Sequence, residues 1–104
     1  MASVKAYFLL PLKDNEGGSL RWAIRKLVHE VYCRFDGWSK EGVVEGAFRM
    51  LDGRMALDKS ERYMVFLDEG RLSELEVLLR DFKSDARQEK LYLEVQHDVD
   101  IRLI

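Results

Sequence analysis

The chain is poor in cysteine, has no large excess of charge of either sign and contains no long hydrophobic run. Cys33 is the only cysteine among 104 residues, so no disulfide can form within the chain, and we expect a cytoplasmic protein. Lys and Arg total 17 and Asp and Glu total 19, which gives a formal net charge of −2. This balance argues against a nucleic-acid-binding protein that depends on a positive field.

The hydrophobic segments also argue against a membrane protein. The first one, Ala6–Leu12, contains Pro11 and runs into the polar residues 13–16. It is far too short to span a bilayer, and it lacks the small-residue cleavage site of a signal peptide. We therefore predict no membrane partner and interpret this segment as the first strand.

The length and composition are those of an ordinary soluble protein. Hydrophobic residues make up 47% of the chain and charged residues 35%. A chain of 104 residues has room for one domain, so we expect residues 1–104 to fold as a single unit.

The clearest pattern lies at the C-terminus, where apolar and polar residues alternate from Leu91 to Leu103. Such alternation predicts a strand with one buried and one wet face. An unbroken strand would be about 43 Å long at ~3.3 Å per residue, which is long for a small domain. We expect either a bulge near His97–Asp98 or a far end that pairs outside the domain.

The other periodicities predict two helices and three more strands. Ser19 is a candidate N-cap for the first helix, Gly37 a candidate stop, and Asp52-Gly53 a hairpin turn. The elements are strands at Val4–Leu12, Val43–Met50 and Glu61–Leu67 (its start as early as Met55), and helices at Leu20–Arg34 and Arg71–Ser84.

These elements predict a fold as well as an order of strands. The first and third strands are apolar on both sides, which is typical of central strands, whereas the last strand is two-faced like an edge. This matches a ferredoxin-like α+β fold, βαββαβ, with a four-stranded antiparallel sheet in the order 4-1-3-2 and two helices on one face.

The sheet face without helices is the first candidate binding surface. Tyr7, Leu9 and Tyr92 would place apolar groups on it, and such a patch marks a partner or a ligand. Two copies packed sheet to sheet as a homodimer would bury it. Alternatively, loops or a long hairpin of the same chain cover it.

The outer face of the first helix is a second candidate surface. Trp22 lies there, and tryptophan is favoured at the centres of interfaces, although its ring could instead fold over the preceding loop. His29 and Cys33 are four residues apart on the same helix. Two ligands do not make a metal site, so we predict no metal.

The loop before this helix contains Gly17-Gly18-Ser19, with Lys13 and Arg21 nearby. Free N–H groups at a helix N-terminus favour an anion. The loop lacks the Lys-Ser/Thr ending of a phosphate loop, and a flexible turn with an N-cap explains the same residues.

Three residues are candidates for catalysis. His97 falls in the apolar register of the last strand, where a buried imidazole could act as a general base. Tyr63 and Asp58 lie on or before the third strand, among polar residues. Spacing alone defines no pair of nucleophile and base, and a hydrogen-bonded histidine at a strand end is the plainer reading of His97.

Several short motifs resemble a group of small uncharacterised bacterial proteins. They are loose, and the resemblance spans about residues 4–96. It implies a ferredoxin-like fold and a cytoplasmic bacterial setting, and it implies no reaction. The residues that carry it are Phe35-Asp36-Gly37-Trp38, Gly46, Asp52-Gly53, Asp58-Lys59-Ser60, Tyr63-Met64-Val65 and Gln88-Glu89.

The sequence therefore favours a small cytoplasmic homodimeric binding module without a cofactor, taking a small ligand or a protein partner through the open sheet face or the outer face of the first helix. The alternative is a small cofactor-independent enzyme of the dimeric α/β-barrel type. RNA binding through Tyr7 and Phe66 is disfavoured, because the third strand lacks the Lys/Arg-Gly-aromatic pattern.

Overall fold

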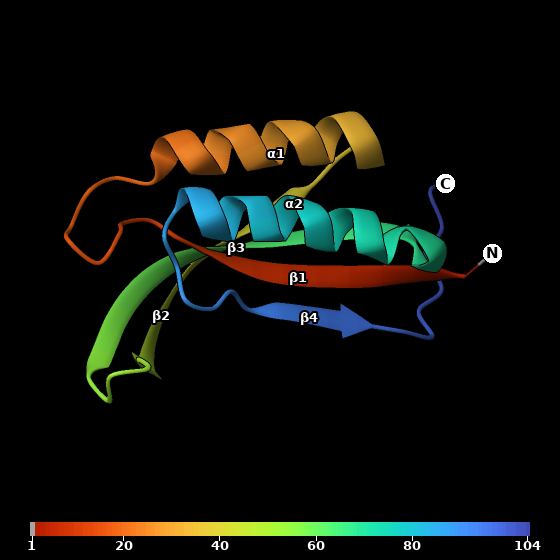
Figure 1. Ribbon diagram of the computed structural model, residues 1–104. Coiled ribbons are helices and arrows are strands. Elements are labelled where there is room, and N and C mark those ends of the chain that lie inside the picture. The colour runs from red at the N-terminus through yellow and green to blue at the C-terminus, as the bar shows by residue number, and fades with distance from the viewer. Residues whose placement is uncertain (1) are drawn as a thin grey trace.

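The computed structural model describes residues 2–104, in which four antiparallel strands form one sheet with two helices on one face (Figure 1). The sheet order is β2-β3-β1-β4, which confirms the predicted order and fold class. The elements are β1 (Ser3–Pro11), α1 (Arg21–Phe35), β2 (Ser39–Arg49), β3 (Met55–Asp68), a 3₁₀ turn (Glu69–Arg71), α2 (Leu72–Asp85) and β4 (Leu93–Gln96).

The core lies between the helices and the two central strands. Phe8 pairs with Tyr63 and Ala6 with Val65 across the β1–β3 ladder, so alternate residues of both strands face the helices. Burial of each large apolar side chain stabilises the fold by roughly 1.5–3 kcal/mol. The helices contribute Leu20, Ala23, Ile24, Leu27, Val31, Phe35, Leu75, Leu78, Leu79 and Phe82.

The ends of α1 differ by one residue from the prediction. Leu20 occupies the N-cap position without a side-chain cap, and Ser19 Oγ accepts a bond from the Arg21 N–H at 3.3 Å. At the other end Asp36, and not Gly37, takes the left-handed conformation, with φ of 68°. Aspartate tolerates this region because its short polar side chain can bond locally.

Strand β2 begins at Ser39, earlier than the predicted Val43. The pairing with β3 shifts between Lys40 and Gly42, where Gly42 has φ of +116°. A bulge of this kind interrupts the alternation of faces. For this reason the alternating pattern, which begins at Val43, did not predict residues 39–42 as part of the strand.

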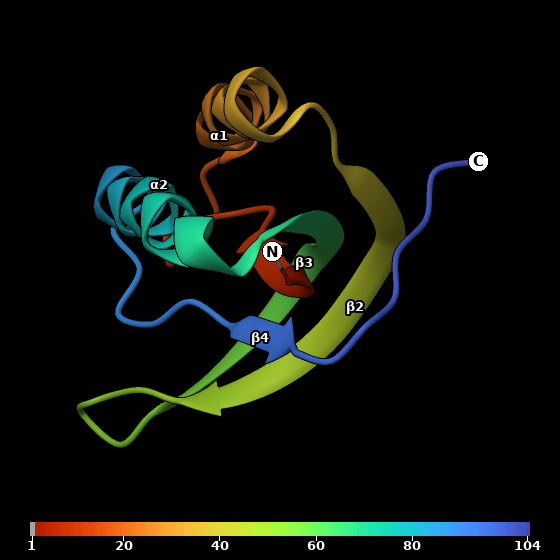
Figure 2. The same cartoon turned by 90° about the vertical axis from the view of Figure 1, so that its right-hand side faces the viewer.

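Strand β4 is much shorter than the predicted strand. It ends at Gln96, and Asp98 has a positive φ of 58°. The prediction of one strand from Leu91 to Leu103 is wrong, although the chain breaks at the expected position. Residues 97–104, the C-terminal tail, contain no strand; they leave β4 and cross to the β2 side of the molecule (Figure 2).

The β2–β3 hairpin projects beyond the helices. Residues 43–59, here called the arm, curve away from the helix layer and curl under the sheet (Figures 1 and 2). The molecule is accordingly elongated, with extents of 44 × 25 × 23 Å. Among residues 2–104, no helix combines the length and apolar character needed to cross a membrane.

Candidate functional site

A pocket lies on the inner side of the arm. Its volume is about 280 Å³, close to the lower end of the range of small-molecule sites. The arm forms one wall, the end of β1 another, and the linker between α2 and β4 the third. The lining residues are Leu9, Pro11, Asn15, Phe48, Arg49, Met50, Ala56, Asp58, Ser60, Gln88, Glu89, Lys90, Leu91 and Tyr92.

The alternation of β2 and β3 aims the arm residues into this pocket. Phe48 pairs with Ala56 and Gly46 with Asp58, so these residues share one face of the ladder. A Cβ at Gly46 would lie 2.9 Å from the Phe48 ring. Glycine at this position therefore leaves room for the ring to lie flat against the strand.

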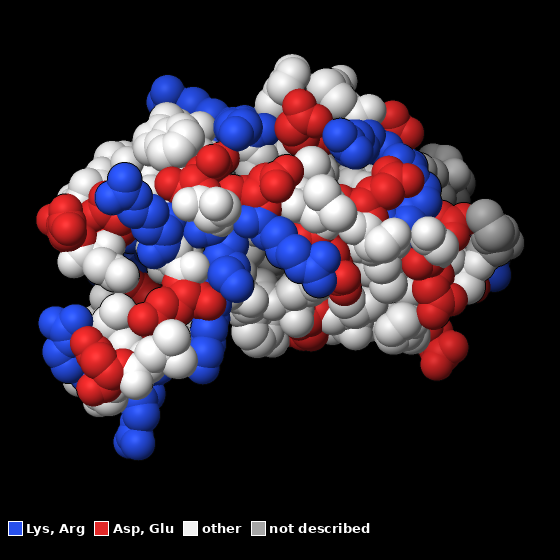
Figure 3. Space-filling model, viewed as in Figure 1, with Lys and Arg blue, Asp and Glu red and all other residues white. Residues whose placement is uncertain are grey.

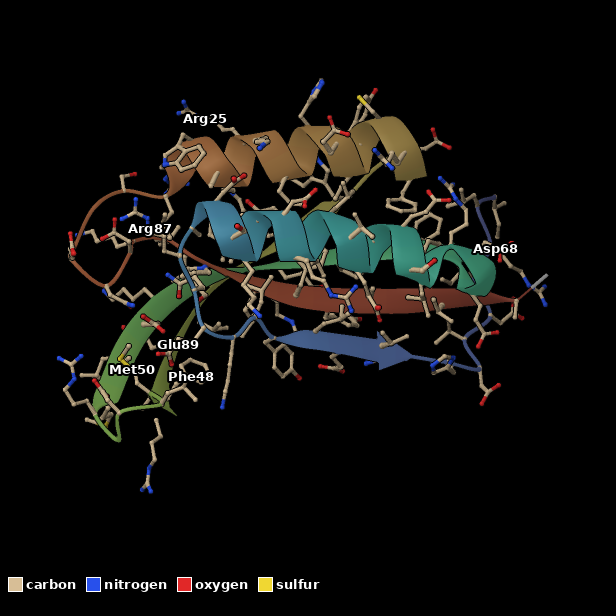
Figure 4. All side chains as sticks on the ribbon, in the orientation of Figure 1. Arg25, Phe48, Met50, Asp68, Arg87 and Glu89 are labelled. Atoms are coloured by element: carbon tan, nitrogen blue, oxygen red, sulfur yellow. The ribbon has the colours of Figure 1, made fainter. Side chains whose placement is uncertain are left out.

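A hydrogen bond connects the tip of the arm to the linker. The Leu51 N–H donates to Glu89 Oε2 at 3.1 Å, and Phe48, Met50 and Glu89 lie close together at this end of the molecule (Figure 4). Tyr92 belongs to the linker wall, and its hydroxyl donates to Glu94 at 2.8 Å. This bond raises the pKa of Tyr92 above its ordinary value.

The helix-free face of the sheet is more polar than the sequence predicted. The guanidinium of Arg62 lies 4.4 Å from the centre of the Tyr7 ring, and its Nε donates to Glu41 at 3.1 Å. Tyr7 is only 9% exposed as a result. The prediction that Tyr7 is an exposed apolar group is wrong, whereas Leu9 and Tyr92 line the pocket.

A second cluster lies on the helix side of β3. The side chain of Glu61 is 4% exposed and faces Arg21 Nη1 and Lys40 Nζ, each at 3.4 Å. Tyr63 donates its hydroxyl to Glu61 Oε1 at 3.0 Å. A buried carboxylate needs such partners, because an unpaired charge away from water is costly.

Tyr63 is held in its protonated form. Burial first, and then the hydrogen bond to Glu61, raise the pKa of Tyr63 well above its usual value. Its ring stacks on Phe8, with centroids 5.9 Å apart, and meets Trp38 edge-on at 5.5 Å. Tyr63 can therefore donate a hydrogen bond, but it is a poor general base.

The three candidate catalytic residues lie in three separate places. Asp58 faces the pocket, and Tyr63 is on the opposite face of the same strand. His97 follows β4 and is exposed, with Nδ1 3.0 Å from Glu69 Oε1. The interpretation of His97 as a buried base is wrong, because the strand ends before it; the plainer reading, a hydrogen-bonded histidine at a strand end, fits.

The outer face of α1 carries the other predicted residues. Trp22 is 54% exposed, and His29 Nε2 lies 3.6 Å from Cys33 Sγ. Across residues 2–104, no group of three His, Cys, Asp or Glu side chains could hold a metal ion.

The glycine loop before α1 is filled by its own aspartate. Asp14 Oδ1 accepts bonds from the N–H groups of Glu16 and Gly18, at 2.9 and 2.7 Å. These two loop N–H groups are already paired within the loop. The loop is therefore a closed turn, which agrees with the structural reading of its glycines.

The pocket itself was not predicted, because its walls come from distant parts of the chain. The alternation of Phe48, Ala56 and Asp58 around the hairpin could have indicated a shared face. Nothing in the sequence places Glu89 or Leu91 against the arm. The curl of the hairpin and the bond from Leu51 to Glu89 bring these segments together.

The surface charge around these sites is mixed. Lysine and arginine side chains alternate with aspartate and glutamate across the face seen in Figure 3, as the net charge of −2 suggests. No large field of one sign covers this face.

Comparison with solved structures supports the fold. A phage SAM lyase in complex with S-methyl-5'-thioadenosine superposes with a TM-score of 0.73 and 14% identity, over 92% of this chain and 81% of that chain. CutA1 from Oryza sativa gives 0.63 and 14%, over 98% and 84%. CutA from Synechococcus elongatus gives 0.59 and 10%, over 95% and 80%.

At such low identity the likeness shows the fold alone. No family model matches the sequence, and no curated protein matches it. The chain thus shares its ferredoxin-like architecture with small proteins from a phage, a plant and a cyanobacterium.

Proposed function

We propose that this protein is a small, self-associating module that binds a compact ligand in the pocket beneath the arm. The observation that carries the proposal is the pocket itself, which has a largely apolar surface with polar side chains among its lining residues. Sites for small molecules have this composition: apolar surface supplies affinity, and a few polar groups fix orientation.

The pocket residues indicate the class of ligand. Phe48 and Tyr92 offer aromatic surface, and Asp58 and Ser60 stand on β3 as hydrogen-bonding groups. A flat ring that carries hydroxyl or amino groups suits this arrangement, because the ring contacts the apolar wall while its donors reach the carboxylate.

Self-association is proposed from the outer face of the arm. Met55 and Leu57 share this face with Val43 and Ala47, and Leu57 is 75% exposed. A two-stranded ribbon is only marginally stable by itself in water, and a patch of this kind marks an interface. A homodimer is the simplest closed assembly that would cover it.

Titration calorimetry with S-methyl-5'-thioadenosine tests the ligand proposal. This nucleoside combines a flat base with hydroxyl groups, and the phage SAM lyase, which has the same fold, binds it. We expect saturable binding that Phe48→Ala weakens about tenfold or more, since a lost aromatic contact of this kind costs ~1.4 kcal/mol or more. Asp58→Asn should weaken it as well.

The matched control is Val77→Ala, an exposed position on the outer side of α2, away from the pocket. This variant should bind like the unmodified protein. Absence of binding, or equal loss in the Val77 and Phe48 variants, would contradict the proposed site.

An enzyme is the second candidate, and one observation favours it. The buried Glu61 and Tyr63, flanked by two cations, form a preorganised polar cluster, which is typical of active sites. Incubation with S-adenosylmethionine, followed by chromatography for S-methyl-5'-thioadenosine, tests this alternative. Turnover that Glu61→Gln abolishes would support it, and no product would exclude this reaction.

A further inference from the structure

The C-terminal tail has the residue pattern of a strand but no strand partner among residues 2–104. Val99, Ile101 and Leu103 alternate with Asp100 and Arg102. Arg102 donates to Asp100 through Nε and Nη2, at 3.1 and 2.9 Å. Residues two apart can meet in this way when the backbone is extended and both side chains leave the same face.

The tail is also only partly covered. Val99 and Ile101 are half-buried, Leu103 is 83% exposed, and residues 97–104 have no strand pairing among the described residues. Figure 2 shows the end of the tail lying away from the rest of the chain, on the β2 side. An apolar face with backbone groups free to bond is unfavourable in a single copy.

The sheet offers a free edge that suits such a segment. Within residues 2–104, β2 pairs with β3 alone, so its other edge is open over an 11-residue strand. The β4 edge is shorter, with four residues. It lies beside a groove lined by Glu76, Arg80 and Lys83, and charges of this kind protect an edge from pairing.

One antiparallel register matches both faces of the two segments. When Ile101 lies opposite Gly46, Val99 faces Phe48 and Leu103 faces Val44, so apolar residues meet on the pocket side. On the other side Arg102 lies opposite Glu45. Asp100 then lies opposite Ala47 and diagonal to Arg49, within reach of long side chains. A shift by one residue would reverse the faces.

From this complementarity we infer that residues 99–103 add as a β-strand to the free edge of β2 in a second copy of this chain. The inference rests on the self-association proposed above and adds a contact at the edge of β2 to the one proposed for the outer face of the arm. The β2 edge of the second copy supplies hydrogen-bonding partners for the backbone of the tail. In return, the tail of the second copy pairs with the β2 edge of the first copy.

Cross-linking between copies tests the register directly. In a Cys33→Ser background, one protein carries Ala47→Cys and another carries Asp100→Cys. The two are mixed and oxidised, and a non-reducing gel follows the mixed disulfide. Positions directly opposite each other in a sheet approach within disulfide range. We expect efficient cross-linking of this pair and little for Asp100→Cys mixed with Val77→Cys.

Charge exchange gives a second test that does not depend on disulfide geometry. Sedimentation of the full-length chain should show that Arg102→Glu shifts the assembly toward monomer, and that Glu45→Arg in the same chain restores it. The inference would be overturned if the assembly is unchanged in Arg102→Glu and in Ile101→Asp and if Ala47→Cys and Asp100→Cys form no mixed disulfide. That result would leave the proposed self-associating module intact. An unmodified protein that is monomeric throughout would overturn both.

Discussion

The part of the sheet beneath the helices and the arm share strand β3, yet they are stabilised differently. Under the helices, Phe8 and Val65 are fully buried. On the arm, Met55 and Leu57 are equally apolar but lie in solvent. The first region is stabilised by its own chain, whereas the second has apolar surface that its own chain does not cover.

This difference separates folding from function. Residues that pack the core tolerate few substitutions, because a change in side-chain volume creates a cavity or a clash. The arm contributes little to the core and can carry the pocket and an interface. Variants in the two regions should therefore affect different measurements.

The largest effect is expected in the core. Phe8→Ala removes a fully buried ring that stacks on Tyr63. The free energy of unfolding should fall by about 3–5 kcal/mol, the range for such truncations. Urea denaturation measures it. Leu57→Ala on the arm should change the stability of the monomer by less than about 0.5 kcal/mol, and equal losses would remove the distinction.

The next effect concerns association. Leu57→Asp places a charge on the exposed outer face of the arm. Its dissociation constant for self-association should rise at least about tenfold, equivalent to ~1.4 kcal/mol, while the monomer remains folded. Sedimentation equilibrium measures this change, with Val77→Asp on α2 as the control. An unchanged mass distribution would argue that the arm is not an interface.

A smaller effect should follow from the polar cluster. Tyr63→Phe removes the hydroxyl that donates to Glu61 while keeping the ring between Phe8 and Trp38. We expect a loss of about 0.5–1.5 kcal/mol, the usual net value of a hydrogen bond. A double-mutant cycle with Glu61→Gln isolates the pair. Full additivity would show that the two side chains do not interact.

The smallest effect is a dependence on pH at the sheet surface. Hydrogen bonds from Gln96 and then Tyr92 lower the pKa of Glu94 below its ordinary value of 4.5. The folded state therefore favours the ionised form of Glu94. The ionised carboxylate contributes to the free energy of unfolding above pH 4.5, and this contribution is lost as the pH falls through the lower pKa of the folded state. The melting temperatures of the unmodified protein and Glu94→Gln should converge in acid.

Sequence periodicity predicted the core and the order of strands for a physical reason. Both depend on which residues avoid water, and the segments Val4–Leu10 and Tyr63–Leu67, which are apolar on both sides, record this directly. The same reasoning failed at the C-terminus. Leu91–Leu103 has a strand pattern throughout, but among the described residues it forms a strand only over Leu93–Gln96. A pattern shows that a face must be covered and does not show by which chain.

The pocket lay beyond sequence reasoning for a different reason. It depends on the curl of the arm and on the bond from Leu51 to Glu89, which joins residues 38 positions apart. Leu9 and Tyr92 line it, and their role as binding residues stays a prediction. Tyr7 was predicted with them, but the guanidinium of Arg62 covers its ring, a contact that alternation cannot reveal.

Amide hydrogen exchange at several protein concentrations tests the central comparison most directly. We expect amides of residues 43–49 and 55–59 to be protected in concentrated solution and to exchange faster on dilution, while those of Val4–Leu10 stay protected throughout. Exchange in the arm that is as slow as in the core and independent of concentration would contradict the account.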